Sequence, residues 1–346
     1  MKLAVAIRRM HPRHVFRISR GEREAIENVF LQVEADGIRG CGEASPIAFY
    51  QETAVAVAAR LEGLRDFLAT LRIKSVADIA AAWSAAWPLL QPSRAAQCAL
   101  DLALWDWLGR RLGLTVSELA HGKPAHPVTT FCTIGLSTPD ELVEKIADLR
   151  DFAAIKIKSG SHADLAPIRQ ITESSTAMTA VDANCAWGEQ DLQSVATDLR
   201  ALGISFIEQP NPPAEDARLR PGAFPLPIVA DESCVTESDV PRVIEHFDGF
   251  NVKLVKCGGL TPALRMLAQG RAAGRKTMVG CMLESSLLIA AGLVAAQNAD
   301  YADLDGAWLL RDDPWSGLNF DRGILRSSLE PGFGLAGDVF ENLQPA

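Results

Sequence analysis

The chain of 346 residues is 48% hydrophobic and 22% charged, and its formal net charge is −9. Such a composition indicates a globular protein, and the length suits one large domain together with a smaller one. The acidic balance and the lack of a long basic block exclude nucleic acid as an expected partner. No apolar run has the length of a membrane helix. The run before Arg8 and Arg9 is too short for a signal peptide, so it predicts a first strand.

The seven cysteines are widely spread, odd in number and without a CxxC pair. This pattern indicates reduced thiols in core positions, and therefore a cytoplasmic protein. A nucleophilic thiol would need a neighbouring histidine, and the six histidines give no indication of one.

Residues 1–125 are predicted to form an α+β unit. Alternating apolar residues at 29–34 and 38–43 flank Asp36-Gly37, which is typical of a hairpin turn. The stretch 53–119 is rich in alanine and has helical periodicity. A breaker at 121–124, His-Gly-Lys-Pro, ends this unit.

Eight short apolar stretches alternate with helical ones after Pro127, and their starts are spaced by roughly 22 to 27 residues. Strands that alternate with amphipathic helices form parallel sheets, and eight such units favour closure into a TIM-type (β/α) barrel. We expect this barrel over residues 126–320 and a tail, 321–346, that packs back on the first unit. The predicted strands are 129–134, 154–158, 179–184, 205–209, 228–232, 250–256, 277–281 and 302–305.

Acidic residues end three consecutive predicted strands: Asp182, Glu208 and Asp231. Neighbouring barrel strands bring their carboxyl ends to one mouth, where barrel enzymes place their chemistry. Three such carboxylates would repel one another and become protonated unless a cation neutralised them. Oxygen ligands without imidazole or thiolate predict Mg²⁺, one ion per chain. Each acid alone could equally cap a helix, but three in succession make that the weaker interpretation.

Lysines on the second and sixth predicted strands lie among β-branched apolar residues, where an unpaired ammonium is costly. Alternation directs Lys156 and Lys158 into the barrel. On the sixth strand we prefer Lys253 to Lys256, which alternation directs the other way, although the sequence leaves this choice open. Because the two strands lie on opposite sides of the barrel, they predict two-base proton transfer next to a metal-held carboxylate. Burial and nearby positive charge are expected to lower the pKa of such a base.

Together these motifs resemble the enolase superfamily, in its muconate-cycloisomerase-like branch, over nearly the whole chain. The resemblance implies a modified (β/α)7β barrel, with residues 1–125 as an α+β capping domain. It also implies that Lys158 and Lys253 are the acid/base pair, and that the three strand-end acids hold Mg²⁺. The motifs that carry the resemblance are 42–46, 99–107, 156–158, 182–184, 207–210, 230–233 and Lys253 with Gly258-Gly259.

The eighth predicted strand carries Asp303 and Asp305, which face the same way and would enter the barrel mouth opposite the metal. Carboxylates that no metal claims suit a cationic group on a substrate. An Asp-x-Asp at this place resembles the dipeptide epimerases, which implies that the pair holds the α-ammonium of an L-amino acid dipeptide. The expected reaction inverts the α-carbon of the C-terminal residue, L,L to L,D, through an enediolate.

Further contacts are expected around this centre. Loops at 16–24, 47–51 and 281–285 are expected to set the side-chain specificity. The first loop carries Arg17, Arg20 and Arg23 beside two glutamates, so its charge does not decide between an acidic and a basic substrate. The predicted substrate contacts are Thr133, Lys156, Cys281 and Met282, and the predicted supports of the metal ligands are Asn184 and Glu232.

The sequence leaves other functions open. A muconate cycloisomerase, an o-succinylbenzoate synthase or an N-acylamino-acid racemase would share the same core. The substrates of the first two are anionic and lack an ammonium, so two extra carboxylates would repel them. A silent barrel scaffold or binder is the non-enzymatic alternative, and it gives no reason to bury unpaired charge. A homo-oligomer is compatible with the sequence, but no feature of the chain fixes the oligomeric state.

Overall fold

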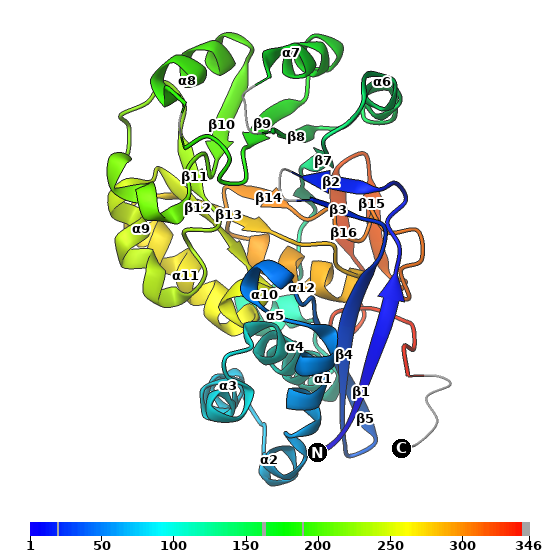
Figure 1. The fold of residues 1–346 in the computed structure, drawn as a ribbon. Coiled ribbons are helices and arrows are strands. Elements are labelled where there is room, and N and C mark those ends of the chain that lie inside the picture. The colour runs from blue at the N-terminus through cyan, green and yellow to red at the C-terminus, as the bar shows by residue number, and fades with distance from the viewer. Residues whose placement is uncertain (19–20, 161–163, 189, 341–346) are drawn as a thin grey trace.

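The computed structural model describes residues 1–18, 21–160, 164–188 and 190–340. Figure 1 shows two parts: a barrel of strands surrounded by helices, coloured green to orange, and a smaller unit of strands and helices, coloured blue to cyan. The described residues contain no helix long and apolar enough to cross a membrane.

The smaller unit begins with an antiparallel sheet of β1 (Lys2–Met10), β4 (Ile26–Ala35) and β5 (Ile38–Ala44), with β4 in the middle. The predicted hairpin is confirmed, because β4 and β5 pair from Ala35↔Ile38 to Val29↔Ala44. Its turn places Asp36 at φ 55° and Gly37 at φ 74°. Two consecutive positive φ angles match the twist of the strands, which explains the Asp-Gly pair. A short hairpin of β2 (Phe16–Ile18) and β3 (Gly21–Arg23) precedes β4.

Helices follow the sheet, and four of them begin where a hydroxyl side chain caps the first turn. Thr53, Ser75, Ser93 and Thr115 accept hydrogen bonds from the first turns of four helices. The longest helix, α4, is buried along residues 95–109 because the β sheet packs on it from one side and the barrel from the other. These elements are the 3₁₀ helix η1 (Ala48–Tyr50), α1 (Ala54–Glu62), α2 (Arg65–Thr70), α3 (Val76–Leu90), α4 (Arg94–Leu112) and α5 (Val116–His121).

The predicted barrel is confirmed as one eight-stranded parallel sheet in sequential order. It is nearly closed, since the Phe131 amide donates to the Ala302 carbonyl (2.9 Å) where the first and last strands meet. The strands are β7 (Cys132–Ile134), β8 (Ala154–Lys158), β9 (Met178–Asp182), β10 (Ile204–Glu208), β11 (Ile228–Ala230), β12 (Gly249–Lys253), β13 (Lys276–Gly280) and β14 (Tyr301–Asp303).

Several predicted strands, such as the third, fifth and eighth, end one or two residues earlier than expected, and two differ more. The first, 129–134, is divided into β6 (Val128–Thr129) and β7. The sixth, 250–256, ends at Lys253, and the chain turns at once into the short helix α10 (Leu254–Cys257). Strand alternation therefore does not apply to Lys256, because Gly258 and Gly259 at φ 97° and 127° allow a tight helical turn directly after the strand.

Helices connect the barrel strands on the outside, apart from a 3₁₀ segment between β10 and β11. No helix follows β14 within residues 304–340. The connecting elements are α6 (Pro139–Asp148), α7 (Leu165–Ser174), α8 (Leu192–Ala201), η2 (Pro213–Arg218), η3 (Glu237–Asp239), α9 (Val240–His246), α11 (Leu260–Ala272) and α12 (Ser286–Ala296).

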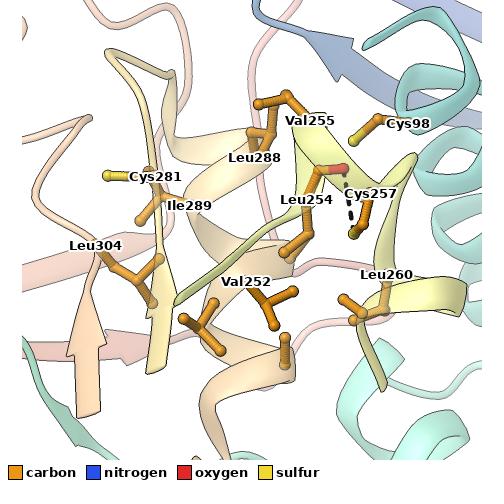
Figure 2. Close-up of a cluster of buried hydrophobic side chains, with 14 of the residues drawn as sticks. Cys98, Val252, Leu254, Val255, Cys257, Leu260, Cys281, Leu288, Ile289 and Leu304 are labelled. Atoms are coloured by element: carbon orange, nitrogen blue, oxygen red, sulfur yellow. Dashed lines mark hydrogen bonds between the residues drawn. The ribbon is translucent and has the colours of Figure 1, made fainter. Parts of the chain in front are cut away.

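The core is continuous between the two parts. Figure 2 shows Cys98 of α4 beside Cys257 of α10, with Val255, Leu260 and Leu288 from the barrel side packed around them. All seven cysteines are free, and only Cys185 is not buried. Burial raises the pKa of the Cys257 thiol to about 12, so it serves as an apolar filler.

The chain after the barrel contacts both parts. Strands β15 (Leu318–Asp321) and β16 (Ile324–Ser327) form a hairpin, and β16 pairs with β6. Further on, the Phe333 amide donates to Asp106 of α4 (2.9 Å), and the Gly332 carbonyl accepts from Val116 of α5 (2.8 Å). Arg8 of β1 donates through Nε to the Val339 carbonyl (2.8 Å). The end of the described chain thus completes the unit in which the chain begins.

Candidate active site

Three carboxylates meet at the mouth formed by the carboxyl ends of the barrel strands. Asp182 ends β9 and Glu208 ends β10, directly opposite each other in the parallel register, and Asp231 follows β11. One carboxylate oxygen from each of the three lies within 4.8 Å of the other two, and the three side chains are essentially inaccessible to solvent. The strand order therefore brings together the acids that the sequence singled out.

The electrostatics and the donor set of this cluster fit Mg²⁺. Burial, followed by the charge of Asp182, raises the pKa of Glu208 to about 7. A divalent cation would relieve this repulsion, and carboxylate oxygens without imidazole or thiolate are the ligands that Mg²⁺ prefers.

One lysine lies at each side of the acid cluster. Lys158 of β8 donates to Asp182 at 2.5 Å, and Lys253 at the end of β12 donates to Asp231 at 2.8 Å. Burial favours the neutral form of Lys253, but the charge of Asp231 outweighs it and raises the pKa above the usual range. The lowered pKa expected from the sequence is thus not observed for Lys253, because its nearest charge is negative.

Lys256 has a different environment from Lys253. Its ammonium donates to the backbone carbonyl and the side chain of Asp231, both at 2.6 Å, and to the Asn251 carbonyl at 3.2 Å. These three bonds use every donor of the ammonium group, whereas Lys253 lines the cavity described below. This arrangement makes Lys256 an anchor for Asp231 and leaves Lys253 facing the cavity.

Asp303, which ends β14, and Asp305, two residues after it, face the same cavity. Asp303 accepts a bond from Lys156 through Oδ2, while its buried Oδ1 has no hydrogen-bond partner. Asp305 accepts from the Thr133 amide at 2.7 Å. Burial, and then the charge of Asp303, raises the pKa of Asp305 to about 6. A buried carboxylate oxygen without a donor is costly, so this pair is suited to an incoming cationic donor.

Lys156 links the aspartates to the acid cluster. Besides Asp303, its ammonium lies 3.3 Å from Glu208 and 3.5 Å from Asp182, and the side chain is 2% exposed. Burial opposes its charge, but three carboxylates outweigh burial and raise its pKa well above the usual value. The predicted substrate contact is therefore held in the structure as a bridge between two groups of acids.

Asn184 and Glu232, predicted as supports, lie beside the acid cluster. The Asn184 amide donates to Asp182 at 2.8 Å, and its side chain donates to Glu232 at 3.3 Å. Asn184 adopts φ 45°, a left-handed conformation that asparagine tolerates better than most residues.

Two supporting residues were missed by the sequence reasoning. Asn251 donates to Glu208 at 2.8 Å, and Gln209 accepts from the amides of Asp231 (2.8 Å) and Ser233 (3.1 Å). Asn251 shares the strand face of Lys253, and a polar residue at that inward position was a signal for its role. Gln209 is held at φ 36° directly after Glu208, which no sequence pattern indicated.

A cavity of about 450 Å³, here called the first cavity, lies above these groups. The smaller unit covers it with the β2–β3 hairpin and the segment 47–50, which fall in two of the loops expected to set the side-chain specificity. Arg17 forms ion pairs with Glu141 (2.8 Å) and Glu22 (3.2 Å), and Arg20 lies outside the described residues. The predicted site residues among its lining are Thr133, Lys156, Lys158, Asn184, Asp231, Glu232, Lys253, Cys281, Met282, Asp303 and Asp305.

Glu43 of β5 fastens the smaller unit to the wall of the first cavity. It is fully buried and accepts from the side chain of Asn28 (2.7 Å), from the amide of Ser285 (3.0 Å) and from the hydroxyl of Ser285. Burial, opposed by these bonds, raises its pKa to about 7. Asn28 also donates to the Leu283 carbonyl at 3.2 Å, so the loop that carries Cys281 and Met282 is fixed from the other unit.

The sequence matches two protein families, one over the smaller unit and the other over the barrel. Residues 2–120 match the mandelate racemase/muconate lactonizing enzyme N-terminal domain, and residues 140–340 match the enolase C-terminal domain-like family.

The chain is also similar to proteins of known name along most of its length. It is 34% identical to an L-Ala-D/L-amino acid epimerase of Flavobacterium johnsoniae, over 97% of this chain and 99% of that protein. It is 36% identical to a hydrophobic dipeptide epimerase of Roseobacter litoralis, over 93% and 95%. Among solved structures, the dipeptide epimerase from Methylococcus capsulatus complexed with Mg and the dipeptide L-Arg-D-Lys superposes with a TM-score of 0.89. That match has 32% identity and covers 97% of this chain and 99% of the other.

Proposed function

The chain belongs to the enolase superfamily, in the group of mandelate racemase and muconate lactonizing enzymes, and on this basis we propose that it is a Mg²⁺-dependent dipeptide epimerase. The reaction inverts the α-carbon of the C-terminal residue of an L,L-dipeptide. Its relatives in Flavobacterium johnsoniae and Roseobacter litoralis, both named as epimerases of this kind, support the proposal over nearly the full length of the chain.

One observation carries the proposal: a single cavity contains two lysines on opposite sides of an acid cluster, together with a buried carboxylate oxygen of Asp303 that has no donor. The lysines suit the removal and return of a proton on opposite faces of one carbon. The unsatisfied oxygen suits a substrate with a free amine. The cycloisomerase and synthase alternatives use anionic substrates and leave this oxygen without a role.

The roles of the residues follow from their positions. Asp182, Glu208 and Asp231 hold the metal, which when bound supplies the positive charge that stabilises negative charge on the substrate carboxylate. One of Lys158 and Lys253, in its neutral form, accepts the α-proton from one face. The other, protonated, donates a proton to the opposite face, so the configuration inverts.

Asp303 and Asp305 bind the α-ammonium, and the hydrogen bond that Lys156 donates to Asp303 holds this carboxylate in position. Charge-assisted hydrogen bonds of this kind are stronger than neutral ones, so they orient the amine end of the dipeptide firmly. The fixed distance between ammonium and carboxylate sites then places the α-carbon of the second residue between the lysines.

We also propose that the enzyme is cytoplasmic. The seven cysteines are all free in the structure, and thiols of this kind stay reduced in the cytoplasm.

Deuterium exchange tests the proposal directly. The protein would be incubated in D₂O with Mg²⁺ and dipeptides that have acidic, basic or hydrophobic second residues, and α-deuterium would be measured by mass spectrometry. We expect exchange and formation of the L,D product from at least one L,L-dipeptide, and loss of both with EDTA. Failure of every dipeptide to exchange would reject the epimerase assignment.

Removal of the amine separates the epimerase from its racemase relatives. The N-acetylated form of the best dipeptide keeps the carboxylate but lacks the cation, so the wild-type enzyme should exchange it at least about 100-fold more slowly. Equal rates on the acetylated and free dipeptides would favour an N-acylamino-acid racemase.

A further inference from the structure

A second cavity of about 420 Å³ lies beside the first. Its floor contains three aromatic rings from separate segments: Phe152 before β8, Trp308 after β14, and Phe320 of β15. The ring centres of Trp308 and Phe320 are 5.5 Å apart and stacked, and that of Phe152 lies 5.6 Å from Trp308. All three rings are partly exposed to solvent. Aromatic surface gathered in a concave site indicates ligand binding more often than chance exposure.

The two cavities share a wall. Phe16, Thr133 and Leu309 line both of them. The same wall holds Asp305, because the Thr133 amide donates to its carboxylate (2.7 Å) and the Leu309 amide donates to its carbonyl (3.0 Å). The group proposed to bind the α-ammonium therefore lies at the boundary between the cavities. A dipeptide held by its amine at this point would have its first side chain next to the second cavity.

Three cationic side chains around the second cavity have partners within the protein. Arg13 donates to the Trp308 carbonyl at 2.6 Å, and Arg322 pairs with Asp321 at 3.3 Å. Lys145 donates to the Ser137 hydroxyl at 2.8 Å, and burial lowers its pKa. These cations already have partners, so the aromatic floor remains the main surface offered to an occupant.

We propose that the second cavity receives the side chain of the amino-terminal residue of the dipeptide, and that this side chain is large and aromatic. The inference rests on the proposed epimerase function and adds its substrate class. The volume of the cavity accommodates a phenylalanine or tryptophan side chain, and rings that pack against Trp308 and Phe320 gain the stacking geometry that aromatic pairs prefer.

The test compares rates of exchange for L-Phe-L-Ala, L-Trp-L-Ala and L-Ala-L-Ala with the wild-type protein. We expect kcat/KM for the aromatic dipeptides to exceed that for L-Ala-L-Ala by at least about tenfold, a ratio that a hydrophobic pocket readily supplies. A wild-type preference for L-Ala-L-Ala would overturn the proposal. If no dipeptide exchanges at all, it is the epimerase function that fails.

Two variants locate the effect in the second cavity. Phe320→Ala removes one ring of the floor, and Val15→Trp places a bulky side chain at another residue that lines the cavity. Both should reduce the preference for L-Phe-L-Ala by about tenfold or more and leave kcat/KM for L-Ala-L-Ala within about twofold. Leu329→Ala, at a side chain 73% exposed on the surface, is the matched control.

The filling variant keeps the test valid if Phe320→Ala fails to fold, because Val15→Trp removes no buried group. An unchanged preference in Val15→Trp would overturn the proposal. A second result would also overturn the proposal. If free phenylalanine changed the rate on L-Ala-L-Ala without competing with the dipeptide for binding, the second cavity would be a separate effector site.

Discussion

Lys158 and Lys253 are held by different members of the acid cluster, and this makes their roles separable. Lys158 donates to Asp182 from β8, and Lys253 donates to Asp231 from β12. Each lysine therefore reaches the space above the cluster from one side only. In the proposed reaction, the proton on the α-carbon would face one lysine in the L,L-dipeptide and the other lysine in the L,D-dipeptide.

Substitution of one lysine should consequently block one direction of exchange. In Lys158→Met and Lys253→Met, epimerisation should fall by about 10²- to 10⁴-fold, the usual contribution of a general acid or base. Each variant should still exchange the α-proton of one diastereomer, and the two variants should retain opposite ones. Proton NMR in D₂O with separate L,L and L,D substrates measures this.

Lys276→Met is the control for this experiment, because Lys276 is 56% exposed and lies at the end of β13 away from the site. This variant should exchange the α-proton of both diastereomers at the wild-type rate. If Lys158→Met and Lys253→Met lose exchange of the same diastereomer, the two-base assignment is wrong.

Asn251 supports Glu208 without reaching the cavity, and its contribution is expected in metal binding. Asn251→Leu keeps the volume and removes the 2.8 Å hydrogen bond to Glu208. We expect the affinity for Mg²⁺ to fall by about 10- to 100-fold, as for other groups that orient metal ligands, with kcat largely recovered at saturating Mg²⁺. Calorimetric titration with Mg²⁺ measures the change. The exposed Asn319→Leu is the control, and equal affinities of the two variants would show that Asn251 has no such role.

At the scale of elements, the strands that carry the site were predictable and their ends were not. The acids at 182, 208 and 231 follow apolar stretches of the expected period, and the structure places all three at one mouth. The end of β12 depends on two glycines with positive φ and on the bonds of Lys256 to Asp231. Such a turn is set by tertiary contacts, so alternation alone gave an incomplete account of Lys256.

The packing of β5 on α4 leaves no space for a side chain at Gly42. A Cβ built there would lie 1.9 Å from the Ala99 carbonyl oxygen. Gly42→Ala should therefore force the strand from the helix and lower the free energy of unfolding by about 2 kcal/mol or more.

Urea denaturation of Gly42→Ala would be compared with Gly160→Ala, where an added Cβ meets no atom within 4 Å. The control should change stability by less than about 0.5 kcal/mol. Equal stability of the two variants would contradict the close approach of β5 and α4.

At the scale of the whole molecule, Glu43 accepts a hydrogen bond from Ser285, which lies 242 positions later in the chain. The sequence marked the segment 42–46 but gave no partner for this glutamate, since a contact of such separation leaves no local pattern. The same is true of the barrel closure between Phe131 and Ala302. Periodicity identifies elements, whereas the contacts that join distant elements depend on the complete fold.

The raised pKa of Glu43 makes this junction sensitive to pH. Its pKa is about 7 in the folded protein and near the ordinary 4.5 in the unfolded chain, so the folded state binds the proton more tightly. The stability that protonated Glu43 contributes is present below pH 4.5 and is lost as the pH rises through 7.

Relative to Glu43→Gln, the wild-type protein should therefore lose up to about 3 kcal/mol of unfolding free energy between pH 4.5 and 8. Denaturant unfolding at several pH values measures the difference, with the exposed Glu330→Gln as control. Parallel pH profiles for wild type and Glu43→Gln would contradict the assignment of this buried proton.

The contacts of Gly332 and Phe333 with α4 and α5 have a consequence for synthesis of the protein on the ribosome. The first unit is translated early, yet Asp106 receives the Phe333 amide, and Val116 finds its carbonyl acceptor at Gly332, only after the whole barrel has been made. While residues 332 and 333 are still inside the ribosomal exit tunnel, a nascent chain cannot complete these bonds. The first-made unit therefore acquires its final structure only after the barrel has been synthesised, and a chain truncated before residue 332 would never acquire it.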